Sequence, residues 1–210
     1  MRFKEYFNNL LTSKTFRAKH FALFGMVFNF IWSVIKIVLG VYFFSLYFLI
    51  TGIYTLLLGL TKRTFAINQN HDNENIKFKK SIVIMIFVLI VSILYTVNMA
   101  SLFATQDQQN YHLIVSIAIA TFAFTELTLG IINFVKAKKS NDTLLTSYRA
   151  SSLVSSLFAI VTTQIALLSA TNSEAYMYNA LTGTIFGAFS IVIAVFVLIN
   201  IRKNKANFKN

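Results

Sequence analysis

The sequence predicts an all-α membrane protein, a six-helix transmembrane bundle arranged as three hairpins. Hydrophobic residues make up 56% of its 210 positions and charged residues only 12%, about half the charged fraction of a soluble domain. A soluble core could not bury so much apolar surface, whereas the lipid of a bilayer accepts it. The apolar residues also fall into segments long enough to cross a membrane, and the connections between them alternate between basic and free of Lys and Arg.

The apolar segments locate the six helices. One crossing needs about 20 residues. The apolar run from Phe21 to Thr61 is twice that length, so it must fold back, around Gly40 to Ser45. The remaining segments each fit one crossing. The predicted helices span about 21–39, 42–61, 81–104, 113–135, 143–170 and 179–201.

Lys and Arg predict the orientation of these helices. They crowd the leader, the connections at 62–80 and 136–149, and the tail. They are absent from 106–112 and 171–178, and the first turn has only Lys36 beside it. Because basic connections stay on the cytoplasmic side, the pattern predicts a multi-pass protein of the cell membrane with both termini cytoplasmic.

The same distribution explains the net charge of +12. Basic residues that flank membrane segments meet anionic lipid headgroups. The expected partner is therefore the lipid bilayer, and we expect no nucleic-acid partner.

Three regions follow from this layout: a basic leader at 1–19, the transmembrane domain at 20–202 and a short basic tail at 203–210. In the leader, apolar residues share one helical face beside basic positions. These residues are Phe3, Phe7, Leu10 and Leu11. Their spacing favours a helix that lies on the inner leaflet over a flexible leader.

Two ionisable residues, Lys36 and Glu126, lie at depth in the predicted bundle, where a charge is costly and marks a functional candidate. Counted from the inner face at 1.5 Å per residue, Glu126 is about 15 Å deep and Lys36 about 22 Å. Two long side chains can span the difference. Three interpretations stay open: an ion pair, a lysine that extends outward beside a protonated or hydroxyl-bound glutamate, or a proton or ion relay.

Polar residues recur at helical spacing beside these two positions. Asn29 and Ser33 precede Lys36 on one face of the first helix, and Asn133 follows Glu126 on one face of the fourth. Such faces turn toward the bundle interior rather than toward lipid. They line a water path or form hydrogen bonds between helices, and we favour the second interpretation.

The sixth predicted helix carries small residues along one flank, namely Gly183, Gly187 and Ser190. Small residues let two helix backbones approach closely. The flank therefore predicts helix packing, either inside the bundle or at the seam of a homodimer.

The residue types give little sign of chemistry. There are no cysteines, so a thiolate metal site is excluded. His71, Asp72 and Glu74 could bind a metal, but their polar neighbours indicate a solvated loop. Because no nucleophile and base, phosphate loop or metal-ligand spacing occurs, we expect no enzyme, no cofactor and no metal site.

Two stretches resemble the membrane domain of cation diffusion facilitators. The segment 29–58 has that family's spacing of Lys36, Gly40 and Ser45, and the segment 143–170 is similar to its fifth helix around Ser155, Ser156 and Leu157. The resemblance implies six helices, cytoplasmic ends and exchange of a divalent metal for protons.

The residues that would bind the metal depart from the family. The positions that the resemblance aligns with its His and Asp ligands hold Tyr54 and Leu58, then Tyr148 and Ser152. None of these forms a divalent-metal site, and the family's C-terminal domain is missing. The resemblance therefore implies a relative that does not transport divalent metals. The substrate-binding subunits of energy-coupling-factor transporters are similar only in size and in Ala18 and Ala22, and the absence of proline counts against them.

Two functional hypotheses follow. The first is a transporter-like bundle that moves or senses a small solute or ion through an interior formed by Asn29, Lys36, Tyr54, Glu126, Tyr148 and Ser152. The second is a non-transporting scaffold or accessory subunit that packs against a partner through the flank of the sixth helix. A polar cavity at the depth of Glu126 would favour the first hypothesis, and solid packing there would favour the second.

Overall fold

The computed structural model describes residues 14–42, 44, 46–69, 73–105, 142–169 and 175–207, together with isolated residues between 117 and 135. All regular structure in these ranges is α-helical, which confirms the all-α prediction. The described residues between 117 and 135 are helical as well, and the rest of the predicted fourth helix lies outside the described residues. The five complete helices are α2 (Lys14–Tyr42), α3 (Leu46–Asn68), α4 (Glu74–Thr105), α6 (Thr143–Ser169) and α7 (Ala175–Asn207).

Four of these helices contain segments that are long and apolar enough to cross a membrane. The segments are Ala18–Tyr42, Glu74–Thr105, Thr143–Ile165 and Ala175–Lys203. α3 is not among them; Lys62 and Arg63 lie in its last two turns. These segments support a multi-pass membrane protein.

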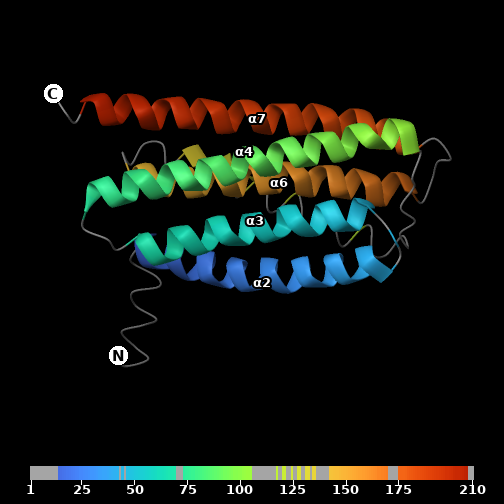
Figure 1. The fold of residues 1–210 in the computed structure, drawn as a ribbon, viewed down its shortest axis with the longest axis horizontal. Coiled ribbons are helices and arrows are strands. Elements are labelled where there is room, and N and C mark those ends of the chain that lie inside the picture. The colour runs from blue at the N-terminus through green and yellow to red at the C-terminus, as the bar shows by residue number, and fades with distance from the viewer. Residues whose placement is uncertain are drawn as a thin grey trace.

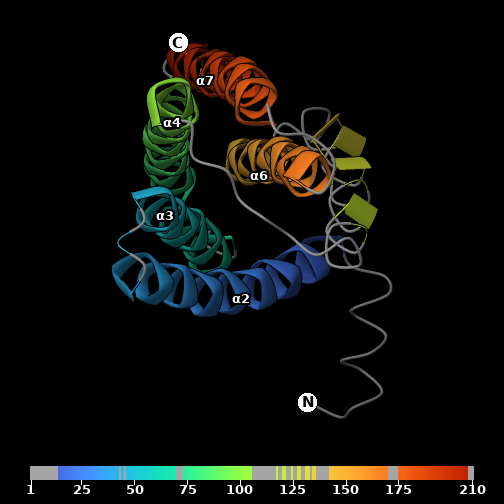
Figure 2. The same cartoon turned by 90° about the vertical axis from the view of Figure 1, so that its right-hand side faces the viewer.

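The helices lie side by side with their axes roughly aligned (Figure 1). α3 runs opposite to α2 and α4, α7 runs opposite to α6, and α4 and α6 run in the same direction. The start of α2 and the end of α7 lie at the same end of the bundle. Viewed along the axes, α3 lies between α2 and the other helices (Figure 2). α6 packs against α3, α4 and α7, whereas α2 contacts only α3 among the described helices.

Charge gathers at one end of the bundle, which we call the basic end. It contains the starts of α2, α4 and α6 and the ends of α3 and α7 (Figure 1). Lys36 is the exception among the charged residues of the five helices; every other one lies within about two turns of this end. The five helix ends at the opposite side carry none.

The first hairpin turns where the sequence predicts it. α2 ends at Tyr42 and α3 begins at Leu46. Between them, the N–H of Phe44 donates to the carbonyl of Val41 at 3.4 Å, and Phe44 has a positive φ of 51°. α2 itself begins at Lys14, so residues 14–19 are continuous with the first helix, and residues 1–13 lie outside the described residues.

Glycines bring α2 and α3 close together. A Cβ atom on Gly40 would lie 2.8 Å from the backbone nitrogen of Leu49. A Cβ atom on Gly52 would lie 2.6 Å from Cγ1 of Ile37. Both distances are shorter than van der Waals contact. The close approach of α2 and α3 therefore requires glycine, which has no Cβ atom, at both positions.

The small-residue flank of α7 packs inside the chain. A Cβ atom on Gly183 would lie 2.5 Å from Cγ of Met99, and one on Gly187 would lie 3.1 Å from the Cα atom of Thr96. Ser190 on the same flank is fully buried. This flank is therefore a contact surface with α4, and α4–α7 is one of the two most extensive helix pairs, beside α2–α3.

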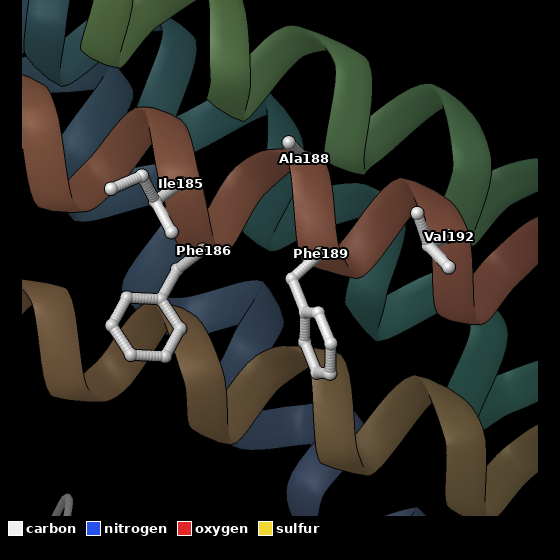
Figure 3. A pocket seen from close by; sticks show the side chains of 5 residues that line it. All are labelled: Ile185, Phe186, Ala188, Phe189 and Val192. Carbon is white, nitrogen blue, oxygen red and sulfur yellow. The ribbon is translucent and has the colours of Figure 1, made fainter.

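The outer faces of the helices are apolar. Large hydrophobic side chains are exposed along α2 and α7, with Phe24 at 74% and Val192 at 61%. On α7 a shallow hollow of about 400 Å³ is lined entirely by apolar residues, and Phe186 and Phe189 extend from α7 toward α6 (Figure 3). Such surfaces suit contact with lipid acyl chains.

Candidate functional site

The interface between α2 and α3 holds the polar face predicted for the first helix. Asn29 and Ser33 are buried there, and Lys36 is half-buried. The Ser33 hydroxyl donates to the carbonyl of Gly52 at 2.8 Å. The spacing of these three residues brings all of them to the side of α2 that contacts α3.

Lys36 reaches along this interface toward the basic end. Its neighbour Ile37 packs against Gly52, yet the Lys36 ammonium donates to the hydroxyl of Thr55, further along α3, at 3.4 Å. The ammonium also lies 5.5 Å from the centre of the Tyr54 ring. The side chain therefore points into the bundle and away from the nearer helix ends.

The described residues that contact the Lys36 ammonium are neutral. The Thr55 hydroxyl donates its own proton to the carbonyl of Thr51 at 2.6 Å, so its oxygen is free to accept from Lys36. The Tyr54 ring offers its electron-rich face. The described ion pair between Glu74 and Lys77 lies at the basic end, away from Lys36. Glu126, the partner predicted from the sequence, lies outside the described residues, so the predicted pair stays a prediction.

A second lysine, Lys62, enters the same interface from the other direction. Its ammonium donates to Oδ1 of Asn29 at 3.4 Å. Gly25 leaves room for the lysine, because a Cβ atom there would lie 3.0 Å from the ammonium nitrogen. The sequence predicts that Lys62 lies beyond the second helix, where it marks orientation, but α3 continues to Asn68 and Lys62 lies inside it.

The two ammonium groups converge, and we call Lys36 and Lys62 the lysine pair. One ammonium lies beside Thr55, and the other beside Asn29, which itself faces Gly59. The positions Thr55, Gly59 and Lys62 lie along less than two turns of α3, so the charges are about 6–10 Å apart along the axis.

Aromatic rings close the interface on the side of α4 and α6. Tyr54 makes edge contacts with Tyr95 and Phe158 at centroid distances of 5.5 and 5.7 Å. Tyr95 and Phe158 stack at 3.8 Å. All three side chains are buried. Tyr54 therefore links the lysine pair to the packed core.

The predicted interior residues of α6 belong to a different level of the bundle. Tyr148 stacks on Phe65 at 4.1 Å, and Phe65 lies about 16 Å further along α3 than Tyr54. The Ser152 hydroxyl donates to the carbonyl of Tyr148 at 3.2 Å. A buried hydroxyl contact of 2.8 Å between Thr61 and Ser151 joins α3 to α6 nearby. The structure thus divides the predicted interior into two groups.

Asn133 lies outside the described residues, as do His71 and Asp72, while Glu74 pairs with Lys77 at 3.1 Å. The positions that the family resemblance aligns with metal ligands, from Tyr54 to Ser152, are aromatic, aliphatic or hydroxyl residues. Within the described ranges no three His, Cys, Asp or Glu side chains gather to hold a metal ion.

Comparison with protein families and with curated proteins finds no match. No protein-family model matches the chain, and no curated protein matches it significantly. The resemblance to cation diffusion facilitators therefore rests on the residues quoted above and stays a prediction.

Proposed function

We propose that this chain is a cell-membrane protein with six transmembrane helices and both ends in the cytoplasm. Basic residues favour the cytoplasmic face, and the basic end of the described helices includes the start of α2 and the end of α7. The helical residues between 117 and 135 belong to the predicted fourth helix, which together with the five complete helices makes six crossings. Cysteines added singly at Lys79 and Ser101 test the orientation: only the latter should react with an impermeant thiol reagent in intact cells.

We further propose that the α2–α3 interface lets the protein bind and move a small solute or ion. The observation that carries this proposal is the inward direction of the lysine pair. Charged side chains within membrane helices are costly and cluster along substrate or ion pathways. A lysine that served only as an anchor would extend to the nearest membrane surface, whereas Lys36 extends away from its nearer helix end.

The packing of the α7 flank inside the chain weighs against the scaffold hypothesis. Gly183, Gly187 and Ser190 contact or are buried against α4 within the same chain. A partner could reach them only if α4 and α7 separated. A divalent-metal substrate is disfavoured by the absence of carboxylate or imidazole at Tyr54, Leu58, Tyr148 and Ser152.

Reconstituted protein tests the transport proposal. The purified chain in liposomes should accelerate the uptake of at least one of a panel of small inorganic ions and organic acids, measured with entrapped indicators or radiolabel. Lys36→Met should reduce that uptake at least tenfold, because it removes the charge and its hydrogen bond. Lys79→Met is the matched control, since Lys79 is exposed at the basic end and should leave uptake unchanged.

Two outcomes would contradict the proposal. One is uptake by the wild type that equals that of empty liposomes across the whole panel. The other is uptake that Lys36→Met and Lys79→Met leave equally intact.

A further inference from the structure

We infer that α7 carries a binding site for one anionic phospholipid of the leaflet at the basic end. The lipid phosphate would bind Arg202 and Lys203, and one acyl chain would extend along α7 into the hollow at Val192 and Phe189. The ligand is a membrane lipid rather than a transported solute, so lipid binding and transport are tested separately.

The two charges lie at the level of the lipid headgroups. The segment of α7 that is long and apolar enough to cross a membrane runs from Ala175 to Lys203. Its 29 residues span about 43 Å, and a bilayer with its headgroups is about 40–45 Å thick. Because α7 starts at the end of the bundle opposite the basic end (Figure 1), Arg202 and Lys203 reach the headgroup layer at the basic end.

Both charges are available to a ligand. Arg202 and Lys203 are exposed, and neither forms a hydrogen bond or an ion pair with a described residue. Lys77, by contrast, is paired with Glu74. A guanidinium binds a phosphate group through two parallel hydrogen bonds, and a neighbouring ammonium adds a second positive charge. The adjacent pair therefore suits the phosphate of a lipid headgroup.

An apolar face of α7 leads from Lys203 into the membrane. Ile185, Phe189, Val192, Ile199 and Lys203 follow one another at intervals of four, three, seven and four residues, so they lie on one face of the helix. The four apolar side chains of this face are exposed. A lipid whose headgroup binds Lys203 therefore finds apolar contacts for its acyl chain along the same face.

The hollow on α7 lies at the depth where that chain ends. It has a volume of about 400 Å³ and is lined entirely by apolar residues (Figure 3). At 1.5 Å per residue, Val192 lies about 16 Å from Lys203 along the axis, and Phe189 lies about 21 Å from it. Half of the hydrocarbon core is about 15 Å thick, and the headgroup layer adds about 5–8 Å. Because the hydrocarbon core holds no water, the end of an acyl chain is the natural occupant of the hollow.

α4 provides a matched comparison for the two charges. Lys79 and Lys80 form an exposed basic pair on α4. Counted from the contact between Thr96 and Gly187, the α4 pair and the α7 pair both lie about 22–26 Å toward the basic end. A general attraction of basic residues to anionic lipid would act on both pairs alike, whereas the proposed site depends on the α7 pair.

Lipid-dependent thermal stability tests the site. The full-length protein in a neutral detergent is titrated with phosphatidylglycerol or with phosphatidylcholine that carries the same acyl chains. We expect phosphatidylglycerol to raise the midpoint of unfolding saturably, by about 3–6 °C, and phosphatidylcholine to bind at least fivefold more weakly. Native mass spectrometry should show one phosphatidylglycerol retained per protein. Equal affinities for the two lipids would overturn the inference.

The charge variants distinguish a site from general attraction. The double variant Arg202→Gln with Lys203→Gln should weaken phosphatidylglycerol binding at least fivefold. The double variant Lys79→Gln with Lys80→Gln should keep the affinity of the wild type. An equal loss in both variants, or wild-type affinity in both, would overturn the inference.

A variant in the hollow tests the position of the acyl chain. Val192→Trp fills the hollow with a side chain and should weaken the binding of long-chain phosphatidylglycerol about threefold or more. Dihexanoyl phosphatidylglycerol is too short to reach Val192 from Lys203, so its affinity should be the same for Val192→Trp and the wild type. Unchanged long-chain affinity in Val192→Trp, or an equal loss for both lipids, would overturn the proposed position of the chain.

Discussion

The α2–α3 and α4–α7 pairs are both antiparallel and both closely packed through glycines, but they use polar groups in different ways. In α4–α7, the hydroxyls of Ser92, Thr96 and Ser190 donate to carbonyls of their own helices, four residues back. In α2–α3, Ser33, Lys36 and Lys62 form their hydrogen bonds across to the other helix.

This difference separates packing from function. Hydroxyls that form hydrogen bonds within their own helix do not join the two helices. The α4–α7 contact therefore depends on shape complementarity, with small residues opposite large ones. Charged side chains that cross an interface bring desolvation costs that packing alone does not require. Under the proposed function, the solute would bind at the α2–α3 pair, and the closely packed α4–α7 pair would support it.

The largest expected effect comes from filling the α4–α7 contact. Gly187→Leu would place side-chain atoms against Thr96, whose Cα atom lies 3.1 Å from the position of a Cβ atom. We expect a loss of about 3 kcal/mol in the free energy of unfolding, measured by denaturation in mixed micelles. Ala188→Leu is the control, because Ala188 is exposed on the neighbouring face, and its stability should change little. Equal stability of the two variants would contradict the packing role.

The opposite result is expected for the charge in α2–α3. Lys36→Met replaces an ammonium by an apolar side chain of similar length, so it removes the cost of desolvating a charge inside the interface. Its free energy of unfolding should rise by about 1–2 kcal/mol. The same micelle denaturation measures it. A marked destabilisation would show that Lys36 stabilises the fold instead of binding a ligand.

A smaller effect separates hydrogen bonds across helices from those within one helix. Ser33→Ala removes the bond to Gly52 and should cost about 1 kcal/mol. Ser190→Ala removes a bond within α7, and its cost should be below about 0.5 kcal/mol. Thermal unfolding of the two variants in the same detergent gives the comparison. The distinction fails if Ser190→Ala costs as much as Ser33→Ala.

The smallest expected effect concerns two glycines of the α2–α3 pair. A Cβ atom on Gly25 would lie 3.0 Å from the Lys62 ammonium, whereas one on Gly59 would have only ordinary contacts, the nearest at 3.4 Å to Asn29. Gly25→Ala should displace the ammonium by a few tenths of an ångström, lengthen its hydrogen bond to Asn29 and slightly lower the midpoint of unfolding. Gly59→Ala should add up to about 1 kcal/mol of stability through helix propensity. Thermal unfolding in detergent measures both, and equal midpoints for the two variants would contradict the role given to Gly25.

Local features of the sequence determined much of the fold. Apolar length predicts where helices run, and the fold-back between Gly40 and Ser45 follows from a run too long for one crossing. The helical period predicts that Asn29, Ser33 and Lys36 share a face. Helix ends were less predictable, because α3 continues to Asn68 and α7 to Asn207 after their apolar stretches stop. Hydropathy marks the edge of the lipid, and a helix does not have to end there.

The sequence by itself determined the all-α class, the apolar helices, the gathering of basic residues between them, and the polar face of α2. Only the tertiary structure decided that α4 pairs with α7, that Gly183 and Gly187 contact α4, and that Lys62 joins Lys36 while Tyr148 does not. Helix formation and membrane crossing depend on residues close in sequence, which a pattern can reveal. The choice of partner depends on how side chains from distant segments fit together, and that fit exists only once the helices have packed.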